Sequence, residues 1–206
     1  HQSHTTDEGR ELALQIMNKL NAYCEKWKKE THLAFSVYGT PMESGTYKFA
    51  KALQRDFDTM PEVNEHDYIT NSYHVNVREE IDAFDKLSKE SEFQSLSSGG
   101  SISYIEIPNM EKNIPALLEV IKFIYDNNMY AECNTRTDVC DTCGFHGEME
   151  MIKDENGNYI WRCPNCGETN IDKLNIVRRV CGYLGRISNG VNLGRLGDIH
   201  DRVFHL

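Results

Sequence analysis

Two cysteine pairs constrain the fold of this chain more than any other feature of its sequence. The first pair is Cys140 and Cys143, the second is Cys163 and Cys166, and nineteen residues separate the pairs. This spacing is typical of four-cysteine zinc sites, because a C-x-x-C step lets two thiolates point at one tetrahedral ion. Asn156-Gly157 lies between the pairs and is the strongest short signal for a β-hairpin, which would bring all four thiols together.

The segments on either side of this turn have the composition of strands. We expect strands at 148–153 and 158–162, and therefore a zinc ribbon with one cysteine pair at each end. A glycine follows each pair, at Gly144 and Gly167, and permits the tight turns that the ribbon needs. Four protein ligands leave no open position on the metal, so the predicted role of the zinc is structural. A redox role for either pair, as in thioredoxin-like motifs, is the alternative.

The seven cysteines and the charge balance limit the class of protein. Cys24, Cys133 and Cys181 lie outside the predicted ribbon, and this usage favours metal binding in an intracellular protein over disulfides. Cys24 lies beside an apolar helical stripe and is predicted to be a packed thiol. The net charge of −10 argues against nucleic-acid and anionic-membrane partners. No apolar run approaches the roughly 18 residues of a membrane span, so we expect a cytoplasmic protein.

Strand and helix patterns alternate up to about residue 130, which favours the α/β class. We expect helices at about 6–30, 40–57, 79–89 and 109–126, and strands at 33–37, 68–75 and 101–107. The first helix has an apolar stripe, formed by Leu12, Ile16, Leu20, Tyr23 and Trp27. The last helix has a predicted inward face, formed by Ile114, Leu117, Leu118, Ile121 and Ile124, and a predicted cap at Asn109. The change of pattern divides the chain into domains at 1–134 and 135–206.

A seven-residue motif near the C-terminus carries a family resemblance. It reads Arg179-Val180-Cys181-Gly182-Tyr183-Leu184-Gly185 and follows the last cysteine of the set, Cys166. The motif and the cysteine set together resemble the C-terminal end of the anaerobic (class III) ribonucleotide reductases, a branch of the glycyl radical enzymes. Further residues downstream resemble the closing segment of that family: Asn192, Gly194, Arg195, Ile199, Arg202, Val203 and His205.

The resemblance assigns a chemical role to one glycine. In that family, the glycine that matches Gly182 stores an unpaired electron on its α-carbon. Only glycine suits this role, because the radical is delocalised over both flanking amides and a β-carbon would oppose the planar arrangement. Taken alone, Gly182 has the alternative of an ordinary turn glycine, and Gly185 competes with it. Cys181 adjoins Gly182 and is predicted to pack beside it rather than to react.

The resemblance also implies a fold, a reaction and partners. The implied fold is α/β, part of a ten-stranded α/β barrel of the glycyl radical enzyme type, followed by a zinc-ribbon hairpin and a C-terminal glycyl radical loop. The implied reaction reduces ribonucleoside triphosphates to deoxyribonucleotides, with formate or a thiol system as reductant. An activase that uses S-adenosylmethionine and an iron–sulfur cluster would take a hydrogen atom from Gly182. The radical would then pass to a loop cysteine, in an enzyme that is a homodimer.

The cysteines outside the predicted ribbon do not match that loop cysteine. We therefore expect the chain to be a fragment, or one piece of a split enzyme, and to be inactive alone. Two alternatives are a stand-alone glycyl radical subunit that complements a separate catalytic chain, and a zinc-ribbon interaction module without radical chemistry. Residues 40–44 and 68–74 resemble segments that border the substrate site, although helix capping and strand packing explain them equally well.

Overall fold

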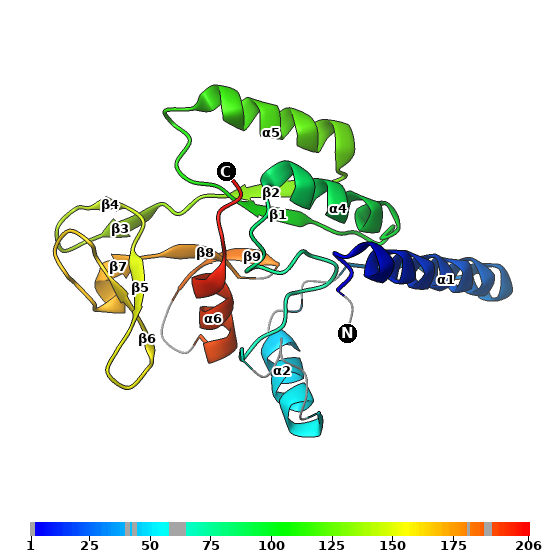
Figure 1. The fold of residues 1–206 in the computed structure, drawn as a ribbon, viewed down its shortest axis with the longest axis horizontal. Helices are drawn as coiled ribbons and strands as arrows, with labels where there is room; N and C mark the ends of the chain where they lie inside the picture. The colour runs from blue at the N-terminus through cyan, green and yellow to red at the C-terminus, as the bar shows by residue number, and fades with distance from the viewer. Residues whose placement is uncertain (1–2, 40–41, 43–44, 58–64, 181, 188–190) are drawn as a thin grey trace.

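The fold is that of a computed structural model, which describes residues 3–39, 42, 45–57, 65–180, 182–187 and 191–206 (Figure 1). Among these residues the helices are α1 (Asp7–Thr31), α2 (Gly45–Asp56), α4 (Ala83–Ser95), α5 (Ile114–Asn127) and α6 (Leu193–Asp201), with a short 3-10 helix at Ile171–Lys173. The strands are β1 (Ser103–Glu106), β2 (Ala131–Asn134), β3 (Asp138–Cys140), β4 (His146–Gly147), β5 (Glu150–Lys153), β6 (Tyr159–Arg162), β7 (Leu174–Asn175), β8 (Val177–Val180) and β9 (Tyr183–Arg186). The fold is therefore mixed α/β, as predicted.

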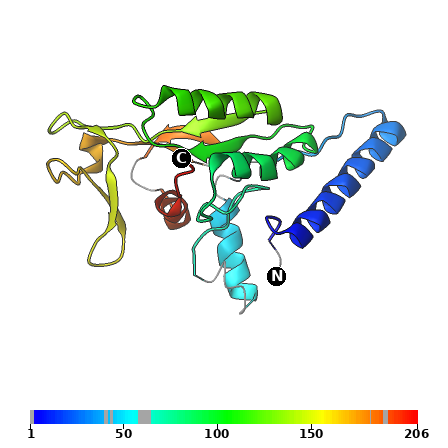
Figure 2. The same ribbon diagram turned by 45° about the horizontal axis from the view of Figure 1, so that its top comes forward.

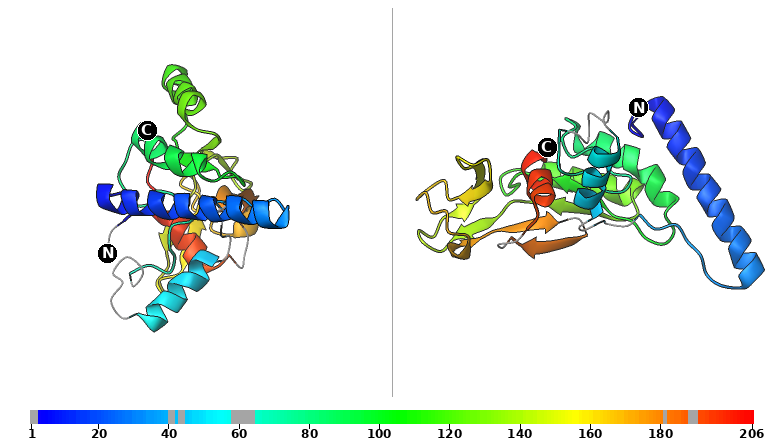
Figure 3. Two further views of the ribbon diagram at one scale, coloured as in Figure 1. Left: turned by 90° about the vertical axis from the view of Figure 1, so that its right-hand side faces the viewer. Right: turned by 90° about the horizontal axis from the view of Figure 1, so that it is seen from below.

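Helix α1 confirms the helix predicted at 6–30, but its apolar side is half-exposed. The Thr6 hydroxyl caps the helix by accepting a hydrogen bond from the Gly9 amide at 3.3 Å. At the other end, His32 takes a left-handed φ of 58° and its amide bonds the Lys28 carbonyl. The predicted stripe keeps 42–55% of its surface exposed at Leu12, Ile16, Leu20, Tyr23 and Trp27. Figures 2 and 3 show α1 extending away from the sheets, which explains this exposure.

Two of the predicted strands are wrong. Residues 33–37 are extended, and the Val37 carbonyl accepts a hydrogen bond from the Gly99 amide at 2.7 Å, but the segment forms no strand. Residues 68–75 contain a turn instead, because the His74 amide donates to the Asn71 carbonyl at 3.2 Å and Ser72 takes a left-handed φ of 51°. A β-like composition produces a strand only where a neighbouring strand pairs with it.

The helix boundaries depend on caps that the sequence pattern placed imprecisely. Helix α2 lies within the helix predicted at 40–57, and residues 40, 41, 43 and 44 of that prediction lie outside the described residues. Helix α4 begins later than predicted, because the Asp82 carboxylate caps it. Helix α5 begins at Ile114 after a cap at Asn113, whereas the side chain of Asn109 closes the preceding turn.

Strands β1 and β2 form a βαβ unit with α5. They pair in parallel, and α5 provides the crossover between them. Because side chains alternate along a strand, Ile105 and Ile107 pack among residues of α4 and α5, whereas Tyr104 and Glu106 contact arginines of β8 and of the chain after α6. Figure 1 accordingly shows α4 and α5 on one side of β1 and β2, with β8, β9 and α6 on the other.

The predicted inward face of α5 is only partly correct. Leu117 and Ile124 pack against the core around the fully buried Val120, as the periodicity predicts for one side of the helix. The other predicted members are 47–58% exposed: Ile114, Leu118 and Ile121. Helix α5 is apolar over more of its circumference than the β1–β2 layer covers, so periodicity alone did not identify the buried side.

Short antiparallel sheets form a second core in the C-terminal half. Strands β5 and β6 form the predicted hairpin, with Gly157 at a left-handed φ of 79° in its turn. Strand β3 pairs with β4 and β7, and β8 pairs with β9. The core consists of Cys140, Met149, Trp161, Cys163, Leu174, Ile176, Ile187 and Ile199.

The predicted ten-stranded barrel has more strands than any sheet among the described residues. The described strands form sheets of two or three strands, so the ten-stranded barrel stays a prediction. Within the described residues, no helix combines the length and the apolar composition needed to cross a membrane.

Candidate metal centre and glycine hairpin

The predicted metal ligands meet at one point in the structure. The sulfur atoms of the set all lie within 4.8 Å of one another: Cys140, Cys143, Cys163 and Cys166. Cys140 Sγ lies 3.7 Å from Cys166 Sγ, and Cys143 Sγ lies 3.7 Å from Cys163 Sγ. These distances far exceed a disulfide bond of about 2.05 Å. They match the edge, about 3.8 Å, of a tetrahedron with zinc–sulfur bonds of about 2.3 Å, so the thiols fit one tetrahedral ion.

Two similar turns hold the sulfur atoms in place. The Gly144 amide donates to the Cys140 carbonyl at 2.8 Å, and the Gly167 amide donates to the Cys163 carbonyl at 2.9 Å. Both glycines take left-handed φ angles, of 71° and 77°. A side chain at either position would strain the turn that orients the thiols, which supports the sequence interpretation of these glycines.

Gly182 lies in the turn of a tight hairpin. Strands β8 and β9 are antiparallel neighbours, and Gly182 directly precedes Tyr183, the first residue of β9. Gly182 is partly buried, and Arg179 Nη1 lies 3.5 Å from its carbonyl oxygen. Gly185, by contrast, lies within β9, while Cys181 lies outside the described residues. The two candidate glycines of the motif therefore occupy different backbone environments, one in the turn and one in a strand.

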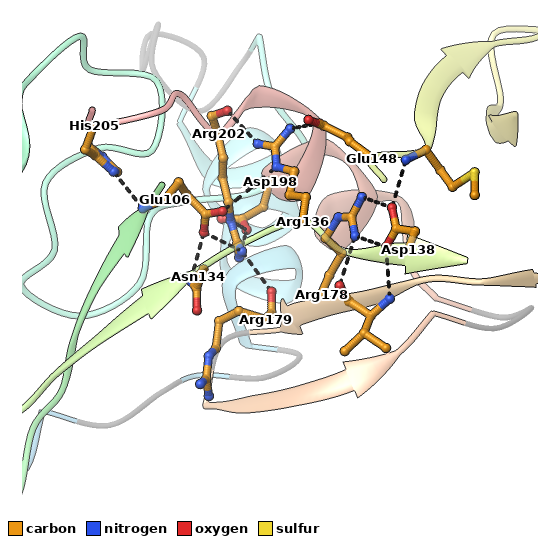
Figure 4. A network of polar contacts seen from close by, with 12 residues as sticks. Glu106, Asn134, Arg136, Asp138, Glu148, Arg178, Arg179, Asp198, Arg202 and His205 are labelled. Atoms are coloured by element: carbon orange, nitrogen blue, oxygen red, sulfur yellow. Dashed lines mark hydrogen bonds and ion pairs between the residues drawn. The ribbon is translucent and has the colours of Figure 1, made fainter. Parts of the chain in front are cut away.

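Arg179 and Arg202 join this hairpin to the rest of the molecule. The Arg179 guanidinium lies over the ring of Tyr104, 5.1 Å from its centre, and forms an ion pair with Glu132 of β2. Arg202 follows α6 and donates from Nη1 to the Arg179 carbonyl at 2.8 Å. Its Nε and Nη2 donate to Asp198 of α6, at 3.0 and 2.5 Å. The hairpin is thus tied both to the β1–β2 layer and to α6 (Figure 4).

Glu106 links the same network to the C-terminus. Its carboxylate accepts hydrogen bonds from the Asn134 amide at 2.9 Å and from Arg202 Nη1 at 3.4 Å. Its backbone amide donates to His205 Nδ1 at 2.8 Å. Burial lowers the pKa of His205 to about 4, and the nearby Lys86 ammonium lowers it as well. The ring is therefore neutral near pH 7, as its role as a hydrogen-bond acceptor requires.

A buried ion pair joins the cysteine cluster to the hairpin. Arg178 Nη2 donates to Asp138 Oδ2 at 2.7 Å, and Nη1 contacts the other carboxylate oxygen. The Arg178 guanidinium also lies over the ring of Trp161, 5.0 Å from its centre. Asp138 begins the strand that ends at Cys140, and Arg178 belongs to the strand that leads to Gly182. Figure 4 shows the two side chains pointing toward one another.

Comparison with known proteins identifies the family. The family model described as anaerobic ribonucleoside-triphosphate reductase matches residues 1–205. The chain belongs to this reductase family. The anaerobic ribonucleoside-triphosphate reductase of Enterobacteria phage T4 is 38% identical over 198 residues, and that of Escherichia coli (strain K12) is 33% identical over 204 residues. The alignments cover 96% and 98% of this chain but 32% and 28% of the two relatives.

Solved structures have a similar fold. A structure of an anaerobic ribonucleotide reductase matches with a TM-score of 0.71 at 23% identity, over 97% of this chain and 29% of the other. The anaerobic ribonucleotide reductase from Thermotoga maritima, with MES in its active site, matches with a TM-score of 0.63 over 88% of this chain and 28% of the other. The chain therefore spans less than a third of the length of these relatives.

Outside the cluster, the thiols that the structure describes, Cys24 and Cys133, lie in regular elements. Cys24 is partly buried on α1, and Cys133 lies within β2. Cys133 packs against the core around Ile105, and burial raises the pKa of its thiol. A raised pKa keeps a thiol protonated and unreactive, so this environment favours a packing role.

The two segments expected to border the substrate site contact one another. Of residues 40–44 the structure describes Met42, whose amide donates to the Asn71 side chain at 2.9 Å. Asn71 also accepts, through its carbonyl, a hydrogen bond from the His74 amide. The turn at 71–74 therefore holds the chain just before α2.

The buried ion network is what sequence reasoning missed. Asp138, Arg178 and Arg202 form charged contacts across segments far apart in the chain. An isolated charged residue normally faces solvent, so the local pattern gave no reason to bury these side chains. One weak signal is the position of Asp138, two residues before the first metal-ligand candidate, Cys140.

Proposed function

We propose that this chain holds the radical store of an anaerobic ribonucleotide reductase, with Gly182 as the radical residue. One observation supports the proposal above all. The chain belongs to this family, and Gly182 of its Arg179–Gly185 motif lies in the turn of the β8–β9 hairpin. The first strand of this hairpin is bonded, through Arg178 and Asp138, to the strand that ends at Cys140 of the four-cysteine cluster. Glycine has no β-carbon to oppose the planar backbone that a radical requires, and the paired strands β8 and β9 fix the position of Gly182.

The hairpin also places a positive group beside the proposed radical. An α-carbon radical is conjugated with the amides on both sides, so it is most stable when these groups are coplanar. The Arg179 guanidinium lies 3.5 Å from the Gly182 carbonyl oxygen, which is part of that conjugated system. We assign to Arg179 the orientation of this carbonyl, through a charge-assisted hydrogen bond.

Cys140, Cys143, Cys163 and Cys166 would hold a Zn²⁺ ion as four thiolates. Bound zinc supplies a fixed tetrahedral cross-link, and its four sulfur ligands leave no position for substrate, so its role is structural. The cross-link ties the end of β3 to the β5–β6 hairpin. We retain the division at 134/135, with the zinc ribbon and the radical hairpin downstream and part of a ten-stranded α/β barrel upstream.

The whole reductase would reduce ribonucleoside triphosphates to deoxyribonucleotides. We propose that a radical S-adenosylmethionine activase removes one hydrogen atom from the Gly182 α-carbon and that formate or a thiol supplies the electrons, in a homodimeric enzyme. Cys24 in α1 and Cys133 in β2 are packed thiols. We therefore place the substrate-activating cysteine in the part of the enzyme that matches no residue of this chain. The coverage of the relatives, 32% and 28%, supports this placement.

The test uses the full-length reductase with its activase under anaerobic conditions. Electron paramagnetic resonance should detect an organic radical in the wild type and in Gly185→Ala, but not in Gly182→Ala. On exposure to air, dioxygen adds to the radical carbon and the backbone breaks there. The activated wild type should therefore lose residues 182–206, which are 25 residues by counting, whereas unactivated protein stays intact.

Two results would contradict the proposal. Cleavage at Gly185 would show that the radical assignment is wrong. Absence of any radical in the activated wild type, together with one bound zinc, would favour an interaction module without radical chemistry. Activity of a separate catalytic chain only after addition of this chain would instead identify a stand-alone radical subunit.

A further inference from the structure

Two neighbouring arginines of β8 face opposite sides of the strand. Arg179 reaches the β1–β2 layer, where it contacts Tyr104 and Glu132. Arg178 points the other way, toward Asp138 of β3 and Trp161 of β6. Side-chain alternation along a strand produces this division. The strand that leads to the Gly182 turn is therefore fixed from two sides by two different parts of the molecule.

Asp138 is the meeting point on the cysteine side. Besides its two contacts with Arg178, its carboxylate accepts the Met149 amide at 2.8 Å and the Val177 amide at 3.4 Å. One carboxylate thus holds the end of the β4–β5 connection, the start of β8 and the Arg178 side chain. Asp138 also lies two residues before Cys140, in the same strand.

The burial of this pair makes its geometry specific. The side chains are 0% exposed for Asp138 and 5% exposed for Arg178, and the Trp161 ring covers the guanidinium. A charge buried this deeply is stable only when its partner is present and correctly oriented. A planar guanidinium contacts a carboxylate through two nitrogen atoms. This bidentate contact fixes the relative orientation of the two side chains as well as their distance. The pair therefore transmits position between the two segments it joins.

We propose that Asp138 and Arg178 are positioning residues that couple the four-cysteine site to the Gly182 hairpin. The proposal rests on the proposed function of Gly182 and the cysteines. The bound metal fixes the end of β3, Asp138 fixes Arg178, and Arg178 sets the register and tilt of β8 four residues before Gly182. Loss of the pair uncouples the hairpin from a metal site that remains intact.

The experiment compares variants of the full-length reductase, each activated anaerobically by the activase. Asp138→Asn keeps the shape of the side chain and removes its charge, and Arg178→Lys keeps the charge but loses the bidentate contact. Glu150→Gln breaks the exposed Arg162–Glu150 pair of the β5–β6 hairpin and is the matched control. Leu87→Ala weakens the other core and controls for a general loss of stability. Zinc per chain, the unfolding temperature and the radical per chain are measured for each.

We expect Asp138→Asn to keep one zinc per chain and to form at least tenfold less radical than the wild type. Arg178→Lys should keep its zinc and give an intermediate yield, because one charged hydrogen bond remains. Glu150→Gln and Leu87→Ala should form radical at the wild-type level. This pattern separates positioning from folding, since Leu87→Ala loses stability without losing the radical.

Three outcomes would overturn the inference. A wild-type radical yield in zinc-loaded Asp138→Asn would show that the pair does not position the hairpin. Loss of zinc together with the radical in both pair variants would show that the pair serves only to fold the cysteine site. A low yield in Leu87→Ala would assign the effect to stability. If the wild type itself forms no radical, the proposed function fails, and that failure is distinct from these three.

Discussion

Replacement of Arg202 by methionine should destabilise the chain by an amount that the structure allows us to estimate. Methionine retains much of the aliphatic stem, so the change removes the charge and its hydrogen bonds. Arg202 is 11% exposed in its side chain and bonds Asp198 twice, the Arg179 carbonyl at 2.8 Å and Glu106 at 3.4 Å. The variant leaves two carboxylates and one carbonyl without this partner.

The size of the loss in unfolding free energy depends on the hydrogen bonds and water contacts that these groups retain. Removal of one partner of a fully buried ion pair costs about 3–5 kcal/mol. Glu106 retains the Asn134 amide at 2.9 Å, and Asp198 is 18% exposed and reaches water. We therefore expect a smaller loss in the free energy of unfolding, about 2–3 kcal/mol. For a chain of this size each kcal/mol shifts the melting temperature by about 2–4 °C, so the midpoint should fall by about 4–12 °C.

The assay is thermal and urea unfolding followed by circular dichroism, with Arg162→Met as the matched control. Arg162 forms a similar pair with Glu150, but both side chains are 45% exposed. An exposed pair contributes only about 0–1 kcal/mol, so this control should change little. Equal losses in the two variants, or a loss below about 0.5 kcal/mol for Arg202→Met, would refute the reasoning that burial gives the Arg202 network its weight.

Three further predictions follow from other parts of the chain. Cys163→Ser should reduce bound zinc from about one per chain to near zero and increase proteolysis after about residue 135, as measured by metal analysis and limited digestion; full zinc content would contradict the ligand assignment. His205 is neutral in the fold with a pKa of about 4, whereas the unfolded chain takes up a proton below about 6.5. The free energy of unfolding should therefore fall as the pH is lowered from 6.5 toward 4. His205→Asn keeps a hydrogen-bond acceptor and should flatten this part of the profile of unfolding free energy against pH. An unchanged slope would exclude His205 as the source of the pH dependence. Leu87→Ala in the fully buried core should cost about 2–5 kcal/mol, whereas Leu118→Ala, 58% exposed in this chain, should stay within about 0.5 kcal/mol; similar losses would contradict the assignment of the buried face.

Features that depend on local spacing could be predicted from the sequence. The two C-x-x-C pairs and Asn156-Gly157 predicted a hairpin that brings four thiols together, because both signals act over a few residues. Apolar periodicity predicted α1 and most of α5, since a helix repeats its contacts every three or four residues. The motif around Gly182 indicated the family for the same reason, as a contiguous set of residues.

Which surfaces meet could not be predicted from local patterns. The predicted strand at 68–75 is a turn, and three of the five residues of the predicted inward face of α5 are exposed, because the presence of a partner surface determines pairing and burial. The pair of Asp138 and Arg178 joins residues 40 positions apart. The contact of Arg202 with Glu106 joins residues 96 positions apart. A charged residue buried by such a distant partner looks the same in sequence as one exposed to water, because only the folded geometry determines whether its charge is compensated.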